Sequence, residues 1–285
     1  MPKNHSDVYL GWLKLAEEAA KRRDYETAAR FYRYVAVHCG LLNDLDNMKN
    51  FTIKTGECYF NAGKKLWNSN PIKALLLCIR ASNCFKEGGD EQRAKKCDQM
   101  IEGYYDSIRR NGIIKSCKDT HDLKRIGDYF ANHDLEKSIE CYEVAAEKAF
   151  EAGKFNLSGS LYGILGECYM ALKRYEDAAE SYARSAEIYH ECQEFFEAAW
   201  HYCISGFYFI LAKNAKKALF MASRAELVCK EDEIRVILND LVLICRLLSE
   251  GSIQEARRIW SRIRMKFKRD YIQIIDSCFR SVNSK

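Results

Sequence analysis

Residues 173–189 read KRYEDAAESYARSAEIY, with alanines and tyrosines at steps of three and four residues. That spacing is typical of one face of an α-helix. Four of the seven residues on this face are alanine, so the face is too thin to fill a core by itself. We expect it to lie close against a neighbouring helix, with the tyrosines filling the wider gaps at its ends. The seven residues are Tyr175, Ala178, Ala179, Tyr182, Ala183, Ala186 and Tyr189.

The same pattern returns along the chain: apolar at the first position, small or apolar at +3 and +4, and apolar at +7. Its copies begin at Tyr25, Ile72, Leu135, Tyr175, Ala215 and, less regularly, Ile253. The last four copies start 40, 40 and 38 residues apart. Such a period is typical of a helical-hairpin solenoid, in which each hairpin buries its apolar face against its neighbours.

Capping signals accompany these copies. Asn or Asp precedes the helices as an N-cap, a proline takes a first helical position, and glycines stand where helices should end. These residues are Asp24, Asn70, Asp134 and Asn214, then Pro71, and finally Gly40, Gly88 and Gly153. Further helices are expected at roughly 6–21, 44–62, 90–110, 120–132, 155–172, 194–212 and 231–249, and strand signals are absent.

The sequence therefore predicts an all-α protein. We expect a right-handed array of antiparallel helical hairpins of tetratricopeptide-like type over residues 1–230. A small C-terminal helical bundle should follow over residues 231–285. The first copies are spaced less regularly, by 47 and 63 residues. The segment 111–121, NGIIKSCKDTH, is predicted to be a linker or inserted loop and a possible internal joint.

Composition indicates an ordinary soluble chain. Of its 285 residues, 48% are hydrophobic and 30% are charged, and we find no uncharged apolar run long enough to cross a membrane. The first residues, MPKNHSDVYLGW, lack the apolar core of a signal peptide. We expect a cytoplasmic protein with at most peripheral association with membranes.

Motifs for catalysis or metal binding are absent. The thirteen cysteines are odd in number and form no CxxC pair, which favours buried thiols in a reducing compartment. His190 with Cys192, and His201 with Cys203, are each two residues apart, so on a helix neither pair can hold one ion. Phosphate loops, GxGxxG and HExxH are not found. We predict a protein that is not an enzyme and has no catalytic residue, metal or cofactor.

Charge is concentrated near the C-terminus. Residues 251–285 hold nine Lys/Arg and three Asp/Glu, a net of +6, whereas the whole chain carries +5. On one continuous helix, basic residues would flank a packing face that includes Trp260 and Phe267. This row is either a solvated face or a docking site for an acidic protein or anionic lipid, and nucleic acid fits least. The predicted partner-binding residues are Arg257, Arg264 and Lys268, together with Lys216, Lys217 and Arg224.

Several stretches resemble the soluble NSF attachment protein (SNAP) family. They are DLEKSIECYEVAAEKA (134–149), YEDAAESYARSAEIY (175–189), NAKKAL (214–219) and LLSEGSIQEARRIW (247–260), and NPIKALLLCIRASNCFKEGG (70–89) is similar to the fourth-helix region of that family. The resemblance covers most of residues 20–280. It implies a twisted sheet of helical hairpins that lies along a SNARE four-helix bundle and recruits a hexameric ATPase, which pulls the bundle apart.

The chain departs from the family pattern at several points. The family's basic SNARE-binding positions fall on Ser160, Ile164 and Glu197. The resemblance implies ATPase docking through Glu250, whereas Ser249 and Arg246 do not match the acidic positions beside it. The apolar membrane loop is replaced by KRRDYETAA, and the acidic tail by FRSVNSK.

These observations leave three functions open. The leading prediction is an adaptor that binds a SNARE bundle and recruits the disassembly ATPase. A second is a structural scaffold for a large helical-repeat protein, because the chain is also similar in layout to the forty-kilodalton huntingtin-associated protein. A general tetratricopeptide-like adaptor is the third.

Overall fold

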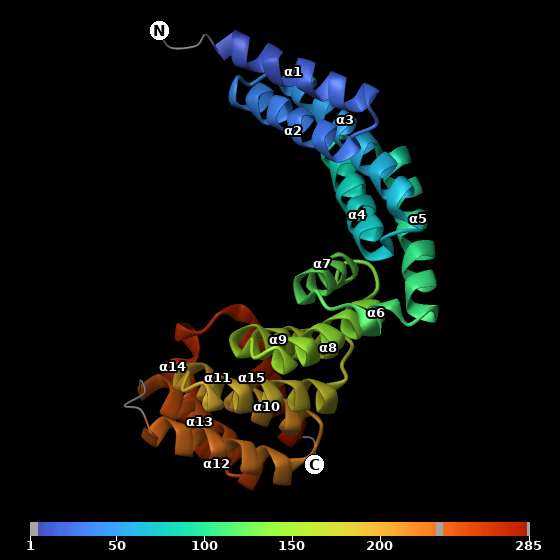
Figure 1. Ribbon diagram of the computed structural model, residues 1–285. Coiled ribbons are helices and arrows are strands. Elements are labelled where there is room, and N and C mark those ends of the chain that lie inside the picture. The colour runs from blue at the N-terminus through green and yellow to red at the C-terminus, as the bar shows by residue number, and fades with distance from the viewer. Residues whose placement is uncertain (1–4, 232–235, 284–285) are drawn as a thin grey trace. The chain divides into compact units, whose positions relative to one another are not determined.

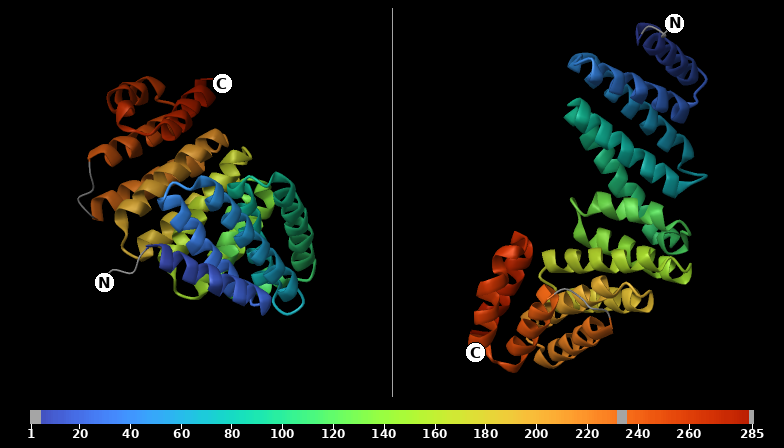
Figure 2. Two further views of the ribbon diagram at one scale, coloured as in Figure 1. Left: turned by 90° about the horizontal axis from the view of Figure 1, so that it is seen from above. Right: turned by 90° about the vertical axis from the view of Figure 1, so that its left-hand side faces the viewer.

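A computed structural model describes residues 5–231 and 236–283 (Figure 1). All regular elements in these two ranges are helices, which confirms the predicted all-α hairpin architecture. The chain divides into two compact units, residues 1–129 and 130–285, and consecutive helices lie side by side within each unit (Figure 2). The predicted domain boundary between residues 230 and 231 stays a prediction.

The first unit contains two and a half hairpins and two shorter helices. Its helices are α1 (His5–Lys21), α2 (Tyr25–Leu41), α3 (Leu45–Leu66), α4 (Pro71–Gly88), α5 (Glu91–Arg110), α6 (Ile113–Ser116) and α7 (Thr120–Phe130). The predicted joint at 111–121 is therefore not a plain loop, because it contains α6 and the start of α7.

The second unit continues the hairpins and ends in the C-terminal helices. Its elements are α8 (Leu135–Glu151), α9 (Phe155–Ala171), α10 (Tyr175–Glu191), α11 (Phe195–Leu211), α12 (Ala215–Glu231), α13 (Val236–Glu250), α14 (Ile253–Ile263), the 3₁₀ helix η1 (Arg264–Lys266) and α15 (Arg269–Asn283). Helix α11 packs against α10, α12, α13 and α15, which explains why it is apolar on almost every side. Of the predicted helix 231–249, residue 231 ends α12, residues 232–235 lie outside the described residues, and the rest belongs to α13.

The alanine face of α10 packs as predicted. Ala178 and Ala179 are completely buried. On the preceding helix, a Cβ added at Gly166 would overlap the ring of Tyr182. Small residues on α9 thus receive the tyrosines of α10, and the two helices approach closely.

One turn geometry closes most hairpins. After α9, Lys173 adopts a left-handed conformation (φ 58°), and its N–H donates to the carbonyl of Met170 at 2.9 Å. The next N–H, of Arg174, donates to the carbonyl of Tyr169 at 2.9 Å. These two bonds form a Schellman motif that satisfies the last carbonyls of the helix and reverses the chain within three residues. The left-handed residue of equivalent loops is Arg23, Asn43, Gly89, Gly153, Gln193, Lys213 or Gly251.

The predicted capping residues are largely confirmed. Side chains of all four predicted N-caps accept a hydrogen bond from the backbone N–H three residues on: Asp24, Asn70, Asp134 and Asn214. Gly88 ends α4, and Gly153 is left-handed. The stop predicted at Gly40 is wrong, because α2 continues to Leu41 and the left-handed turn residue is Asn43.

Candidate functional site

The predicted basic row near the C-terminus is not one continuous helix. Helix α14 ends at Ile263, and Phe267 has extended backbone (φ −105°, ψ 152°). The Phe267 ring lies 5.6 Å from that of Trp260 and 6.3 Å from that of Trp200, between ring centroids. Packing of this ring against α11 and α14 turns the chain, so the prediction of a single basic helix is wrong.

Arg264 is ion-paired with a residue of the C-terminal bundle, although its side chain is 43% exposed. Its Nη2 donates to Oδ2 of Asp276 at 2.7 Å, and Nε1 of Trp260 donates to Oδ1 of the same carboxylate at 2.8 Å. Partial burial raises the pKa of Asp276, but these hydrogen bonds outweigh it and hold the pKa below its usual value. Arg264 therefore joins η1 to α15.

The other two predicted residues of this row remain exposed. The guanidinium of Arg257 lies 5.2 Å from the ring centroid of Phe279, close enough for a cation–π contact. Lys268 immediately precedes α15, and its backbone carbonyl accepts a hydrogen bond from Ile272. Their role in partner binding stays a prediction.

The three predicted residues on α12 have different surroundings. Nζ of Lys217 lies 3.0 Å from Glu176 and 2.9 Å from Glu180, both on α10. Nη2 of Arg224 donates to the hydroxyl of Tyr202 at 3.0 Å. Lys216 is exposed. Two of the three thus have structural contacts within the unit.

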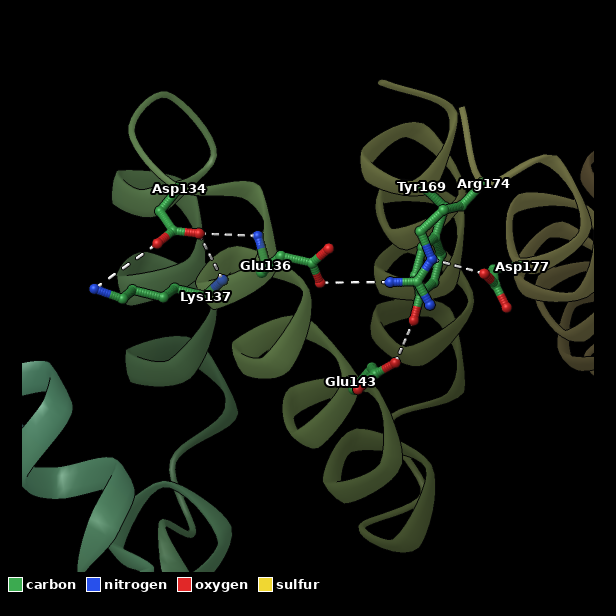
Figure 3. Close-up of polar contacts among 7 residues, drawn as sticks. All are labelled: Asp134, Glu136, Lys137, Glu143, Tyr169, Arg174 and Asp177. Atoms are coloured by element: carbon green, nitrogen blue, oxygen red, sulfur yellow. Dashed lines mark hydrogen bonds and ion pairs between the residues drawn. The ribbon is translucent and has the colours of Figure 1, made fainter. Parts of the chain in front are cut away.

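A second set of ion pairs joins α8 to α10 (Figure 3). Arg174, in the loop before α10, reaches Glu136 of α8 at 3.4 Å and Asp177 at 2.8 Å. Its guanidinium stacks 4.6 Å from the ring centroid of Tyr169, whose hydroxyl donates to Glu143. Together with the Lys217 pairs, these contacts place α8, α10 and α12 side by side. We call their exposed surface the α8–α10–α12 face.

This face is strongly acidic over α8 and α10. Helices α8 and α10 together hold three Lys/Arg and ten Asp/Glu, a net of −7. Its acidic residues are Glu136, Glu140, Glu143, Glu147 and Glu151 on α8, and Glu176, Asp177, Glu180, Glu187 and Glu191 on α10. Exposed ion pairs contribute only about 0–1 kcal/mol each, so the face is more important for its charge than for stability.

Positions implied by the family resemblance lie elsewhere in the second unit. Ser160 and Glu197 are exposed and Ile164 is half-buried, on α9 and α11. Glu250 is exposed at the end of α13 and lines a surface cavity of about 310 Å³ with Lys213, among others. The two mismatched neighbours have internal partners, since Arg246 pairs with Glu226 and Ser249 donates to the carbonyl of Cys245.

Ser185, which is buried, and His201, which is partly buried, form a structural pair. Oγ of Ser185 donates to the carbonyl of Gly159 at 2.6 Å and lies 2.7 Å from Nδ1 of His201. Because the single hydroxyl proton goes to Gly159, Nδ1–H of the imidazole must be the donor to Ser185. Burial lowers the pKa of His201 to about 4. The imidazole therefore presents a proton to the serine and cannot take one from it.

The cysteines have the character of core residues. Eleven of them are buried and two, Cys117 and Cys192, are intermediate. Burial raises the pKa of Cys58 and of Cys229 to about 11, which keeps both thiols protonated. Among the residues that the structure describes, no group of three His, Cys, Asp or Glu is placed to hold a metal ion. Nor is any described helix long and apolar enough to span a membrane.

The ion pairs that Arg174 and Lys217 each make with acidic residues of a neighbouring hairpin were not predicted from the sequence. Their partners lie 38 and 41 residues away, close to one repeat period. Comparing the copies of the repeat for opposite charges at matched positions would have found both.

Comparisons with known proteins show a similarity that covers only part of the chain. No protein-family model matches the chain. The sequence is 26% identical over 132 residues to an alpha-soluble NSF attachment protein of Vitis vinifera; the match covers 45% of this chain and 43% of that protein. Among solved structures, the crystal structure of BtubC (BKLC) from P. vanneervenii matches with a TM-score of 0.37 and 14% identity, over 83% of this chain and 91% of that one. The matched stretch thus spans less than half the length of the attachment protein.

Proposed function

We propose that this chain is a non-enzymatic adaptor that binds other proteins through the exposed surfaces of its helical hairpins. The observation that carries the proposal is the α8–α10–α12 face, where Arg174 and Lys217 join successive hairpins and leave a broad charged surface. Extended surfaces of this kind are how helical-repeat proteins bind their partners.

More specifically, we propose that the chain binds a SNARE bundle and recruits a disassembly ATPase in vesicle trafficking. The similarity to an alpha-soluble NSF attachment protein supports it. So does Glu250, an exposed carboxylate at the end of α13 beside a surface cavity. Of the six predicted partner-binding cations, Arg257, Lys268 and Lys216 are exposed and could pair with an acidic partner.

An assay with purified components tests this form. The wild-type chain should bind an assembled SNARE bundle and raise the ATPase rate of the hexamer. Glu250→Lys should lower the stimulation about tenfold, as expected for an interface charge, with little change in bundle binding. Glu255→Lys is the matched control, because Glu255 is also exposed but lies on α14. Equal stimulation by both variants would contradict docking at Glu250.

A second function is favoured by a specific observation. The positions expected to be basic are Ser160, Ile164 and Glu197, and the α8–α10–α12 face is acidic, which is the wrong sign for an acidic helical bundle. A scaffold for a large helical-repeat protein with basic surface would fit this charge. Failure to bind the SNARE bundle, with one-to-one capture of such a protein, would favour the scaffold over the SNARE adaptor.

A further inference from the structure

A groove opens in the first unit between α3 and α5, over α4. It has a volume of about 250 Å³. Its lining residues are Glu57, Phe60 and Asn61 of α3, Phe85 of α4, and Arg93, Lys96 and Cys97 of α5. None of them belongs to the surfaces assigned above.

The floor of the groove is apolar and well packed. Phe85 is 2% exposed and Cys97 is 1% exposed, and both belong to a small core cluster with Ala81 and Ala94. Phe60 packs against this cluster and is only partly buried. An apolar side chain that entered the groove would therefore lie on this closed floor against the ring of Phe60, and would remove the remaining apolar surface of that ring from water.

The rim of the groove is mainly cationic. The Arg93 guanidinium lies 5.9 Å from the ring centroid of Phe85, and outside the lining residues Nζ of Lys64 lies 5.4 Å from the ring centroid of Phe60. Arg93 is ion-paired with Glu57 across the groove and with Asp90 just before α5, whereas Lys96 is exposed. The whole unit holds 23 Lys/Arg and 17 Asp/Glu, a net of +6. A ligand of complementary charge would therefore carry carboxylates on either side of an apolar side chain.

We infer that this groove docks an acidic, amphipathic segment of a protein partner. One large apolar side chain lies against the exposed part of Phe60, and a neighbouring carboxylate pairs with Lys96. A concave site of this size accepts a single side chain, whereas a membrane surface needs a protruding apolar patch. The inference goes beyond the proposed function, because the groove is a separate site in the first unit. The proposed function does not use it to bind the SNARE bundle or the ATPase.

Binding of synthetic peptides to the full chain tests the inference. The probe is a fluorescein-labelled peptide of sequence EDLFEDLL, compared with QNLFQNLL and KKLFKKLL, and binding is measured by fluorescence anisotropy. The acidic peptide should bind tightest and the lysine peptide weakest. Lys96→Glu should weaken binding of the acidic peptide about fivefold to tenfold, as expected for one reversed rim charge.

Lys95→Glu is the matched control, because Lys95 is the exposed neighbour on α5 that does not line the groove. It should change the affinity less than about twofold. Equal losses in the two variants, equal binding of the three peptides, or no binding of the acidic peptide at millimolar concentration would overturn the inference. So would Lys96-dependent binding to phosphatidylserine vesicles, or Lys96-dependent self-association, without binding of the peptide. Since the assay contains neither SNARE proteins nor the ATPase, its failure leaves the proposed function intact.

Discussion

Helices α2 and α10 share one packing pattern and differ in their outer faces. Both begin Tyr-x-x-Ala-Ala-x-x-Tyr, at Tyr25 and Tyr175, and the central alanines are fully buried in both. At matched positions further along, α2 exposes Tyr34, Val37 and Leu41, whereas α10 carries Arg184, Glu187 and Glu191. The pattern therefore fixes how a helix packs and leaves its outer face free to serve different partners.

The same comparison extends to the aromatic contacts. Tyr32 of α2 stacks on Phe51, with centroids 6.2 Å apart, and Tyr182 of α10 lies edge-on to His201 at 5.4 Å. Phe51 and His201 are matched positions of the two units. The second unit thus has a titratable group where the first has an inert ring.

The largest expected effect is overpacking of the shared inner face. Ala29→Trp and Ala179→Trp should each lower the free energy of unfolding by about 3 kcal/mol or more, because a fully buried methyl has no room to grow. Urea unfolding followed by circular dichroism measures the loss. Glu187→Trp, on the outer face of α10, is the control and should change stability by less than about 0.5 kcal/mol. Similar losses of unfolding free energy at inner and outer positions would show that the two faces do not differ in packing.

A pH-dependent loss of stability should come from the second unit. The pKa of His201 is about 4 in the folded chain against 6.5 for an ordinary histidine. The unfolded state therefore binds a proton first, and the stabilisation present above pH 6.5 should fall as pH drops toward 4, by up to about 3 kcal/mol. His201→Phe, which copies Phe51, should remove this part of the pH dependence. An unchanged profile in that variant would show that other groups cause the loss.

A smaller effect is expected at the left-handed turns. Lys173 and Arg23 occupy matched positions with φ of 58° and 60°. Because glycine takes this conformation without strain, Lys173→Gly and Arg23→Gly should each stabilise by up to about 1 kcal/mol. Differential scanning calorimetry should show a similar rise in melting temperature for both variants. A gain in only one unit would mean that the two turns are not equivalent.

Much of the fold could be predicted from local signals. The alanine faces, the four N-caps and the hairpin period depend on residues close in sequence, and the structure confirms them. The end of α14 could not be predicted, because the apolar spacing continues to Phe267 and the chain turns there through packing of that ring against Trp200 and Trp260. The left-handed turns at Lys173 and Gln193 also gave no signal, since glycine is the usual residue at such positions.

The candidate site was harder to predict for the same reason. Arg264 looked like a surface cation because its partner, Asp276, follows only after a turn that the sequence did not reveal. Lys217 likewise looked free until the repeat placed Glu176 and Glu180 beside it. The acidic α8–α10–α12 face depends on both the repeat and the order of its helices.

The central claim, that the packing pattern is independent of the outer face, is tested most directly by exchanging outer faces. The double variant Val37→Glu and Leu41→Glu gives α2 two outer residues of α10 and keeps Tyr34, whose ring centroid lies 5.7 Å from that of Trp12. Urea unfolding should show a free energy of unfolding within about 1 kcal/mol of the wild type, because the two residues are 56% and 81% exposed. A loss as large as that of Ala29→Trp would contradict the claim and make the outer face part of the core.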